Sequence, residues 1–249
     1  MVLVKMDSSL TTEQGEDFEI TFDNFELNKE RTYEIALLKA SIWYSYHNIS
    51  SEFGNNQLRY RTSSSASWNN VNFDDGIYGV LDINTKLQSV MKTNGDFSVV
   101  SGVDTFNITI SPNYQTLRVL VSVSGGYELD FTTSKLRELL GFTSIVVSST
   151  QQGANAADIT RGVNSLVLKN SLVKNSYDNG ASSNIIYSFV PNVSPGALMD
   201  ITPNNPVYLD INETNNITRI RFQLHDNQNR IVKLNGEHVF LLFDIREKK

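Results

Sequence analysis

The chain of 249 residues is long enough for one large β-sandwich or two small domains, and 40% of its residues are apolar. Its net charge of −6, with no basic patch, excludes the electrostatic footprint of a nucleic-acid-binding protein. The absence of cysteine excludes disulfides and thiolate chemistry. No apolar run approaches the roughly 18 residues of a membrane span, and the N-terminus lacks the apolar core of a secretory signal.

Strands dominate the first part of the chain. Residues 1–16 are polar and predict a flexible N-terminal arm, which we expect to become ordered on a neighbouring molecule. Phe18, Ile20 and Phe22 alternate with polar residues, as in a half-buried strand. The run 33–46 carries apolar side chains on both faces, which places it inside a sheet. Further strands are predicted at 58–62, 68–73 and 77–81, and a helix at 82–93.

The stretch Gly125–Phe142 (GGYELDFTTSKLRELLGF) combines a turn, a strand and a short helix. Residues 127–131 alternate between apolar and acidic side chains, which predicts a strand with one buried face. Lys135–Leu140 contains only helix formers and predicts about two helical turns. Gly141 stands where the residue after a helix end belongs, because glycine reaches positive φ at no steric cost.

The second part of the chain also predicts strands, at 106–110, 117–123, 163–168 and 185–190. Residues 191–206 hold four of the five prolines and predict an irregular crossover. Strands at 207–211, 220–224, 231–234 and 239–245 predict a closing meander, with a hairpin turn at Asn235-Gly236. These patterns predict an all-β fold, a single jelly-roll antiparallel β-sandwich over residues 17–249 with two short helices in its connections.

The sequence contains no recognisable catalytic motif. Phosphate-binding glycine loops and the nucleophile elbow are absent. The histidines His47, His225 and His238 lie far apart, although His225 and His238 are expected on neighbouring strands. Surface imidazoles are the simpler interpretation, and a metal or catalytic pair is the alternative. We therefore assign no catalytic, cofactor-binding or metal residue, and we expect no cofactor.

Two other groups of side chains are candidate binding residues. Residues 70–76 (NVNFDDG) resemble a calcium loop, but the glycine comes one place late and Leu81 replaces the bidentate glutamate. A turn with solvated carboxylates is the preferred interpretation. Five aromatic side chains suit either a sugar-binding platform or a core or oligomer interface. They are Trp43, Tyr44, Tyr46, Tyr60 and Trp68.

Several phrases of the sequence together are similar to one known family. They are Tyr33–Leu38, the strand before Asn48, Gly76–Asn84, Tyr127–Phe142, Ile186–Gly196 and Ile220–Gly236 with the final strand. In these segments the chain resembles the jelly-roll capsid proteins of Polinton/Maverick elements and adintoviruses. Such elements encode a double jelly-roll major capsid protein and a smaller single jelly-roll penton protein. Because 249 residues are too few for two complete jelly rolls, the penton protein is the better match.

The resemblance implies a non-enzymatic structural role. The chain is expected to be the minor capsid (penton) protein of an icosahedral virion, made in the host cell without a secretory signal. It is expected to form a homo-oligomer, a pentamer at the vertex, in contact with the major capsid protein. Neither nucleic acid nor a membrane is an expected partner. Three alternatives stay open: another capsid component, a jelly-roll module that binds glycan or a receptor, and a cupin-like metalloprotein.

Overall fold

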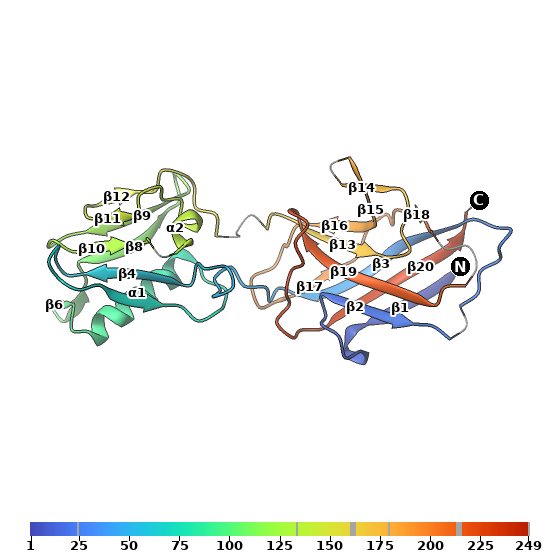
Figure 1. The fold of residues 1–249 in the computed structure, drawn as a ribbon, viewed down its shortest axis with the longest axis horizontal. Coiled ribbons are helices and arrows are strands. Elements are labelled where there is room, and N and C mark those ends of the chain that lie inside the picture. Colours follow the sequence, from blue (N-terminus) through green and yellow to red (C-terminus); the bar gives the residue numbers. More distant parts are fainter. Residues whose placement is uncertain (24, 133, 160–162, 179, 213–215, 249) are drawn as a thin grey trace. The chain divides into compact units, whose positions relative to one another are not determined.

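The computed structural model divides the chain into two compact units (Figure 1). Unit 1 comprises Met1–Tyr46 and Val163–Lys249, and unit 2 comprises His47–Gly162. The structure describes every residue except 24, 133, 160–162, 179, 213–215 and 249. Each unit has its own cluster of buried apolar side chains, where the sequence predicted one domain over residues 17–249. Unit 2 is an insertion in the chain of unit 1.

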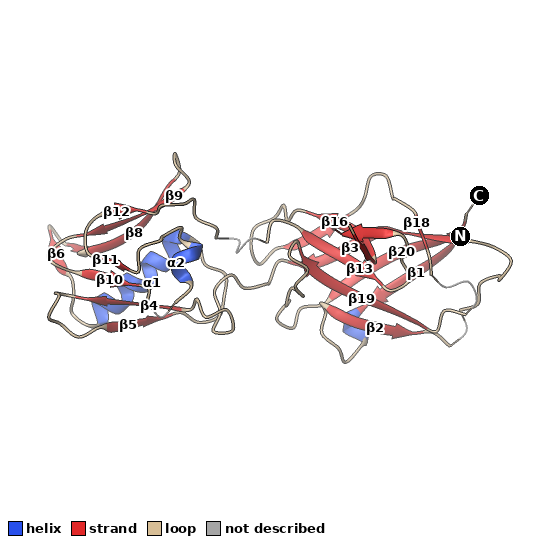
Figure 2. Ribbon diagram, turned by 45° about the horizontal axis from the view of Figure 1, so that its top comes forward, coloured by secondary structure: helices blue, strands red, loops and turns tan. Residues whose placement is uncertain are grey.

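Unit 1 is built from two antiparallel sheets with a core between them (Figure 2). One sheet has the order β1-β20-β3-β17, with β18 also paired to β3, and the other has the order β16-β13-β19-β2. Phe18 and Phe222 meet in the core with ring centroids 5.4 Å apart. The strands of these sheets are β1 (Val2–Asp7), β2 (Asp17–Thr21), β3 (Tyr33–Trp43), β13 (Leu166–Asn170), β16 (Ile185–Phe189), β17 (Leu198–Ile201), β18 (Leu209–Asp210), β19 (Arg219–Asp226) and β20 (Val239–Glu247).

The strand order of unit 1 is that of a jelly roll. Successive strands cross from one sheet to the other, except for β13 and β16, which pair with each other in the same sheet, and β17 and β18, which both pair with β3. This alternation gives the paired Greek keys of the fold. Unit 2 enters the chain between β3 and β13, and a short hairpin enters between β13 and β16. The hairpin consists of β14 (Ser176–Asp178) and β15 (Ala181–Ser183).

The N-terminal residues belong to the sandwich. β1 pairs with β20 along its whole length, from Val2 opposite Ile245 to Asp7 opposite Phe240. Val4 and Met6 of β1 are buried in the core, and a 3-10 turn, η1 (Ser8–Leu10), follows. The expected flexible arm over residues 1–16 is therefore wrong. The strand is stabilised because the alternating side chains of Val4 and Met6 are apolar and become buried in the core.

Unit 2 consists of local hairpins and two helices. One sheet has the order β11-β10-β4-β5 and another the order β12-β9-β8, while β6 and β7 pair with each other. Ile83, Leu87 and Met91 of α1 are fully buried, as the predicted helical spacing requires. The elements are β4 (Gln57–Arg61), β5 (Asn69–Asn72), α1 (Val80–Thr93), β6 (Ser98–Val100), β7 (Val103–Thr105), β8 (Ile108–Asn113), β9 (Arg118–Val123), β10 (Glu128–Asp130), α2 (Leu136–Leu139), β11 (Val146–Val147) and β12 (Gln151–Gln152).

The stretch from Gly125 to Phe142 folds much as predicted. Leu129 and Phe131 are buried on the face that the alternation assigns to the core. The helix α2 is shorter than the predicted two turns, because the chain turns away directly after Leu140. Gly141 ends it at φ +77°, and the Phe142 N–H donates to the Arg137 carbonyl at 2.8 Å.

The predicted C-terminal meander is wrong. β19 pairs with β13 and β2 in one sheet, whereas β20 pairs with β1 and β3 in the other. Asn235 and Gly236 do take positive φ angles of 55° and 87°, so the turn exists, but it joins the two sheets. Two smaller predictions also fail: residues 77–81 contain the start of α1 and no strand, and β17 lies inside the predicted irregular crossover.

Candidate functional site

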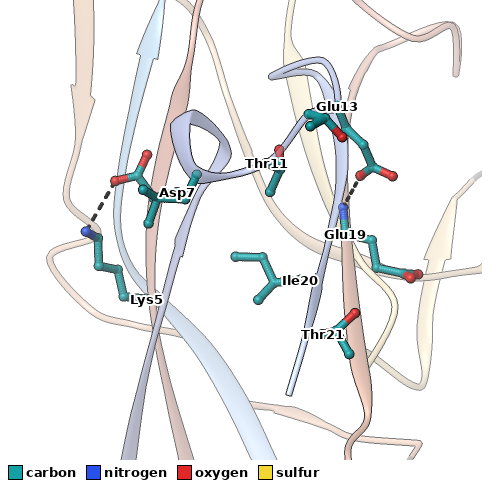
Figure 3. A pocket seen from close by; sticks show the side chains of 9 residues that line it. Lys5, Asp7, Thr11, Glu13, Glu19, Ile20 and Thr21 are labelled. Carbon is teal, nitrogen blue, oxygen red and sulfur yellow. Dashed lines mark hydrogen bonds and ion pairs between the residues drawn. The ribbon is translucent and has the colours of Figure 1, made fainter. Parts of the chain in front are cut away.

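A pocket of about 580 Å³ opens beside the edge strands β1 and β2 of unit 1 (Figure 3). β1 is the last strand of one sheet and β2 the last strand of the other, so their unpaired edges flank the same opening. Residues 10–13, which connect the two strands, also line it. Leu10 is 79% exposed, and Ile20 packs partly against the core. The pocket therefore has two apolar side chains among polar ones.

The charged side chains of the pocket are mostly acidic. Asp7 pairs with Lys5, with Nζ and Oδ2 3.2 Å apart, and the hydroxyl of Ser9 donates to Asp7 at 2.6 Å. Hydrogen bonds from Ser9 hold the pKa of Asp7 below its usual range, despite partial burial, so this carboxylate stays charged. The Oε2 atom of Glu13 accepts a hydrogen bond from the backbone N–H of Glu19. The opening is thus lined by three carboxylates and one ammonium group.

The opposite edge of unit 1 carries the β14–β15 hairpin. β16 ends the sheet on the side away from β2, and β14 packs next to β16. The hairpin projects from the sandwich beyond these strands (Figure 1). Tyr177, the middle residue of β14, is 67% exposed. At the base of the hairpin the hydroxyl of Ser176 donates to the Ser183 carbonyl at 2.7 Å. The exposed Tyr177 side chain is therefore carried by a short hairpin that its own hydrogen bonds hold together.

The three histidines do not come together within either unit. His47 belongs to unit 2, while His225 lies in β19 and His238 in the loop before β20, whose strand is in the other sheet. Nδ1 of His225 lies 3.1 Å from the carbonyl oxygen of Asn229, and its buried Nε2 atom contacts no hydrogen-bonding partner. Burial lowers the pKa of His225, which favours the neutral imidazole. The predicted neighbouring strands for His225 and His238 are thus wrong.

The calcium-like segment forms a strand and a turn. Asn70 and Asn72 lie in β5, which pairs with β4. The backbone is therefore extended at these residues and does not form a calcium-binding loop. Asp75 accepts hydrogen bonds from the backbone N–H of Ser51 at 2.7 Å and from the Ser50 hydroxyl at 3.1 Å. These bonds hold the pKa of Asp75 low. This exposed carboxylate therefore anchors the loop at Ser50 and Ser51, whereas the sequence pattern favoured a turn with solvated carboxylates.

The five aromatic side chains are divided between the two units. Trp43, Tyr44 and Tyr46 belong to unit 1, and Tyr60 and Trp68 belong to unit 2. Tyr44 stacks on the buried Tyr46 with centroids 4.6 Å apart. Tyr60 is fully buried and donates its hydroxyl proton to Asp96 at 2.7 Å. Core packing is the role that the structure gives to Tyr46 and Tyr60.

Trp68 takes part in a charged cluster that the sequence did not reveal. The guanidinium of Arg61 lies 4.4 Å from the Trp68 ring centroid and that of Arg59 lies 5.4 Å from it. Arg59 Nε donates to the buried Asp130 at 3.0 Å, and Arg61 Nε donates to Glu128 at 2.7 Å. Burial alone would raise the pKa of Asp130, but hydrogen bonds from Thr132 and the pair with Arg59 outweigh it and lower the pKa. Pairing of β4 with β10, distant in sequence, assembles this cluster.

Within the described parts of both units, no group of three His, Asp or Glu side chains is placed to hold a metal ion. The helices described by the structure are all too short or too polar to cross a bilayer. The surface features with distinctive geometry are therefore the pocket, the hairpin and scattered exposed apolar side chains.

Comparison with solved structures gives a match to a penton protein that extends over nearly the whole length of both chains. The crystal structure of the mavirus penton protein aligns with a TM-score of 0.51 at 11% sequence identity, covering 99% of this chain and 99% of that one. The chain has the fold of a jelly-roll penton protein. The flagellar cap protein FliD D2-D3 domains from Escherichia coli align with a TM-score of only 0.16 at 11% identity, over 99% of this chain and 100% of that chain, and carry no argument. No family model and no curated protein sequence matches the chain.

The match takes in both compact units, because it leaves almost none of the chain uncovered. It confirms the predicted mostly β, antiparallel fold with a jelly roll and two helices. The identity is too low for residues to be transferred from one protein to the other. Any functional role must therefore be argued from the architecture and tested.

Proposed function

We propose that the chain is a penton-type capsid protein that forms a homopentamer at the vertices of an icosahedral virion. The observation that carries the proposal is the fold match to the mavirus penton protein over the full length of both chains. A jelly roll with a large insertion between β3 and β13 is a more specific feature than the sandwich alone. The sequence phrases similar to Polinton and adintovirus capsid proteins support the same role independently.

The mechanism of such a protein is geometric. A rigid sandwich presents one edge to the next copy and the opposite edge to the previous copy, and rotation closes the ring. The rest of its surface is available to a double jelly-roll major capsid protein, which we propose as the partner in the virion of a Polinton- or adintovirus-like element. The favourable free energy of assembly comes from exposed apolar and aromatic side chains that become buried between copies. No reaction or cofactor is part of this role.

Imaging tests the proposal directly. Purified protein examined by negative-stain electron microscopy should give ring-shaped particles with fivefold rotational symmetry. Co-expression with the major capsid protein of the same element should place the chain at the vertices of assembled particles. Rings with three- or sixfold symmetry, or particles whose vertices lack the chain, would contradict the penton role. The same particles would then point to another capsid component.

A further inference from the structure

The exposed apolar side chains of unit 1 lie mostly at the two edges of its sandwich. Four lie in η1, in β1 or directly before β1, and four more lie in or next to the strands at the β16 edge. The first group is Met1, Val2, Leu3 and Leu10, and the second is Tyr177, Val190, Leu198 and Val207. Scattered single apolar residues are normal on a surface, but two groups at opposite edges mark two candidate contact surfaces.

The two edges differ in shape. The β1–β2 edge is hollowed by the pocket of about 580 Å³, whereas the β16 edge carries the projecting β14–β15 hairpin (Figure 3, Figure 1). Head-to-tail association of identical chains needs two different surfaces that complement each other, and a hollow at one edge with a projection at the other meets this need. Two identical patches would instead favour a twofold dimer.

The two edges also match in chemistry. Tyr177 combines an apolar ring with a hydroxyl donor, and the pocket combines Leu10 and Ile20 with carboxylate acceptors. Glu13 uses its Oε2 atom for the backbone of Glu19, which leaves the second oxygen of this exposed side chain to accept from an incoming hydroxyl. Phenol donors to carboxylates make strong hydrogen bonds in sites from which water is excluded.

We propose that the β1–β2 pocket of one copy receives the β14–β15 hairpin of the next copy, with Tyr177 seated between Leu10 and the Glu13 carboxylate. The occupant is thus a second copy of this chain, and the contact is the repeating interface of the ring. This inference rests on the proposed oligomeric function and identifies the surfaces that produce it. Both surfaces lie in unit 1, so unit 2 does not supply this contact.

Two single substitutions test the two surfaces separately in the full-length protein. Leu10→Asp adds a fourth carboxylate to the pocket, and Tyr177→Asp removes the aromatic ring and adds a charge that the pocket repels. Both side chains are strongly exposed, so neither change disturbs the core. Each variant should raise the concentration at which the oligomer half-dissociates by at least about 30-fold, the effect of losing one interface hot spot.

The matched controls place the same charge on exposed apolar residues elsewhere. Ile231→Asp in unit 1 is the control for Leu10→Asp, and Tyr114→Asp in unit 2 is the control for Tyr177→Asp. Both controls should keep the wild-type mass in light scattering on a sizing column. Loss of assembly in the controls to the same extent would overturn the assignment, because any added charge would then have the effect.

Mixing the two edge variants gives the decisive result. Leu10→Asp keeps an intact hairpin, and Tyr177→Asp keeps an intact pocket. Each variant alone should be a monomer, and an equimolar mixture should form a dimer of about 56 kDa, twice the 28.0 kDa chain, and nothing larger. Two monomeric variants that stay monomeric when mixed would overturn the proposal.

The wild-type mass separates the inference from the function on which it rests. If wild type and both edge variants are pentamers, the interface is wrong and the penton role stands. If wild type is an oligomer of another size that both edge variants abolish, the interface stands and the penton role is wrong. A wild-type monomer at the highest soluble concentration would contradict both.

Discussion

The two compact units are built in different ways from the same kinds of residues. In unit 1 the strands that pair are distant in sequence, as β1 with β20 and β2 with β19 show. In unit 2 most pairs are local, such as β4 with β5, β6 with β7 and β8 with β9. Unit 1 therefore depends on both ends of the chain, whereas unit 2 depends on turns and helix ends inside its own segment. Changes to each unit should therefore have separate consequences.

Deletion of residues 1–10 should have the largest effect on stability. It removes the edge strand β1 and the buried side chains of Val4 and Met6, whose burial contributes about 5 kcal/mol to the free energy of unfolding of unit 1. Chemical denaturation followed by circular dichroism and fluorescence should show the unfolding transition of unit 1 shifted to a much lower denaturant concentration. The transition of unit 2 should stay unchanged. A deletion variant with both transitions at the wild-type midpoint would show that residues 1–10 are the loose arm that the sequence suggested.

A substitution at the end of α2 should destabilise unit 2, by less than the deletion of residues 1–10 destabilises unit 1. Gly141 has φ +77°, and a Cβ atom there would overlap the carbonyl oxygen of Asn155. Gly141→Ala should cost about 3 kcal/mol in the unfolding free energy of unit 2, from backbone strain and the clash together. Gly95→Ala is the matched control, because Gly95 has φ +79° with no atom within 4 Å of the added carbon. This control should lower the unfolding free energy by about 1 kcal/mol. Equal losses of unfolding free energy for the two variants would contradict the close packing of Gly141 against Asn155.

The cluster around Trp68 should contribute a further, acid-sensitive part of the stability of unit 2. The folded state lowers the pKa of Asp130, so its contribution is complete above about pH 4, the range of a free aspartate, and is lost as the pH falls through the lower folded value. Asp130→Asn leaves Arg59 without its charged partner and should cost about 2 kcal/mol near neutral pH, less than a fully buried pair because Arg59 is partly exposed. Denaturation of the variant across this pH range should show a flatter acid dependence than wild type. An unchanged acid limb would contradict the role of Asp130.

Mild acid should lower the stability of unit 1, and this is the smallest of the expected effects. Burial lowers the pKa of His225 in the folded state, so the unfolded chain binds the proton more tightly. Stability is therefore complete above about pH 6.5, the range of a free imidazole, and falls as the pH drops below it. The charged groups that act on this ring are Lys169 on β13, Asp17 on β2 and Asp226 on its own strand.

His225→Asn provides the test of this second pH window. The asparagine amide has a donor in place of Nδ1–H for the Asn229 carbonyl and does not titrate. Thermal unfolding of the variant should lose the decline between pH 6.5 and pH 5 that wild-type unit 1 shows. A wild-type protein whose two transitions respond identically to pH would contradict the separation of the two units.

The sequence predicted local features well. Alternation identified β2, β8 and β9, and helical spacing identified α1. Gly141 was placed correctly because a positive φ at a helix end has a strong residue preference. These features depend on neighbours a few residues away, so their signals are complete within a short window.

The features that the sequence missed depend on distant partners. β1 was missed because its partner β20 lies at the other end of the chain, although Val4 and Met6 already had the spacing of a strand. The cluster around Trp68 was missed for the same reason, since it forms only when β4 meets β10. The pocket was missed because its lining residues lie between Lys5 and Thr21, where the sequence predicted a flexible arm in place of β1. The division into two units was missed because no change of composition accompanies it.

The native mass of the purified wild-type protein tests the central claim most directly. Light scattering on a sizing column should give about 140 kDa, five times the 28.0 kDa chain, as expected for a penton-type ring. A mass of one or three chains, unchanged over a range of protein concentrations, would contradict the proposed pentamer.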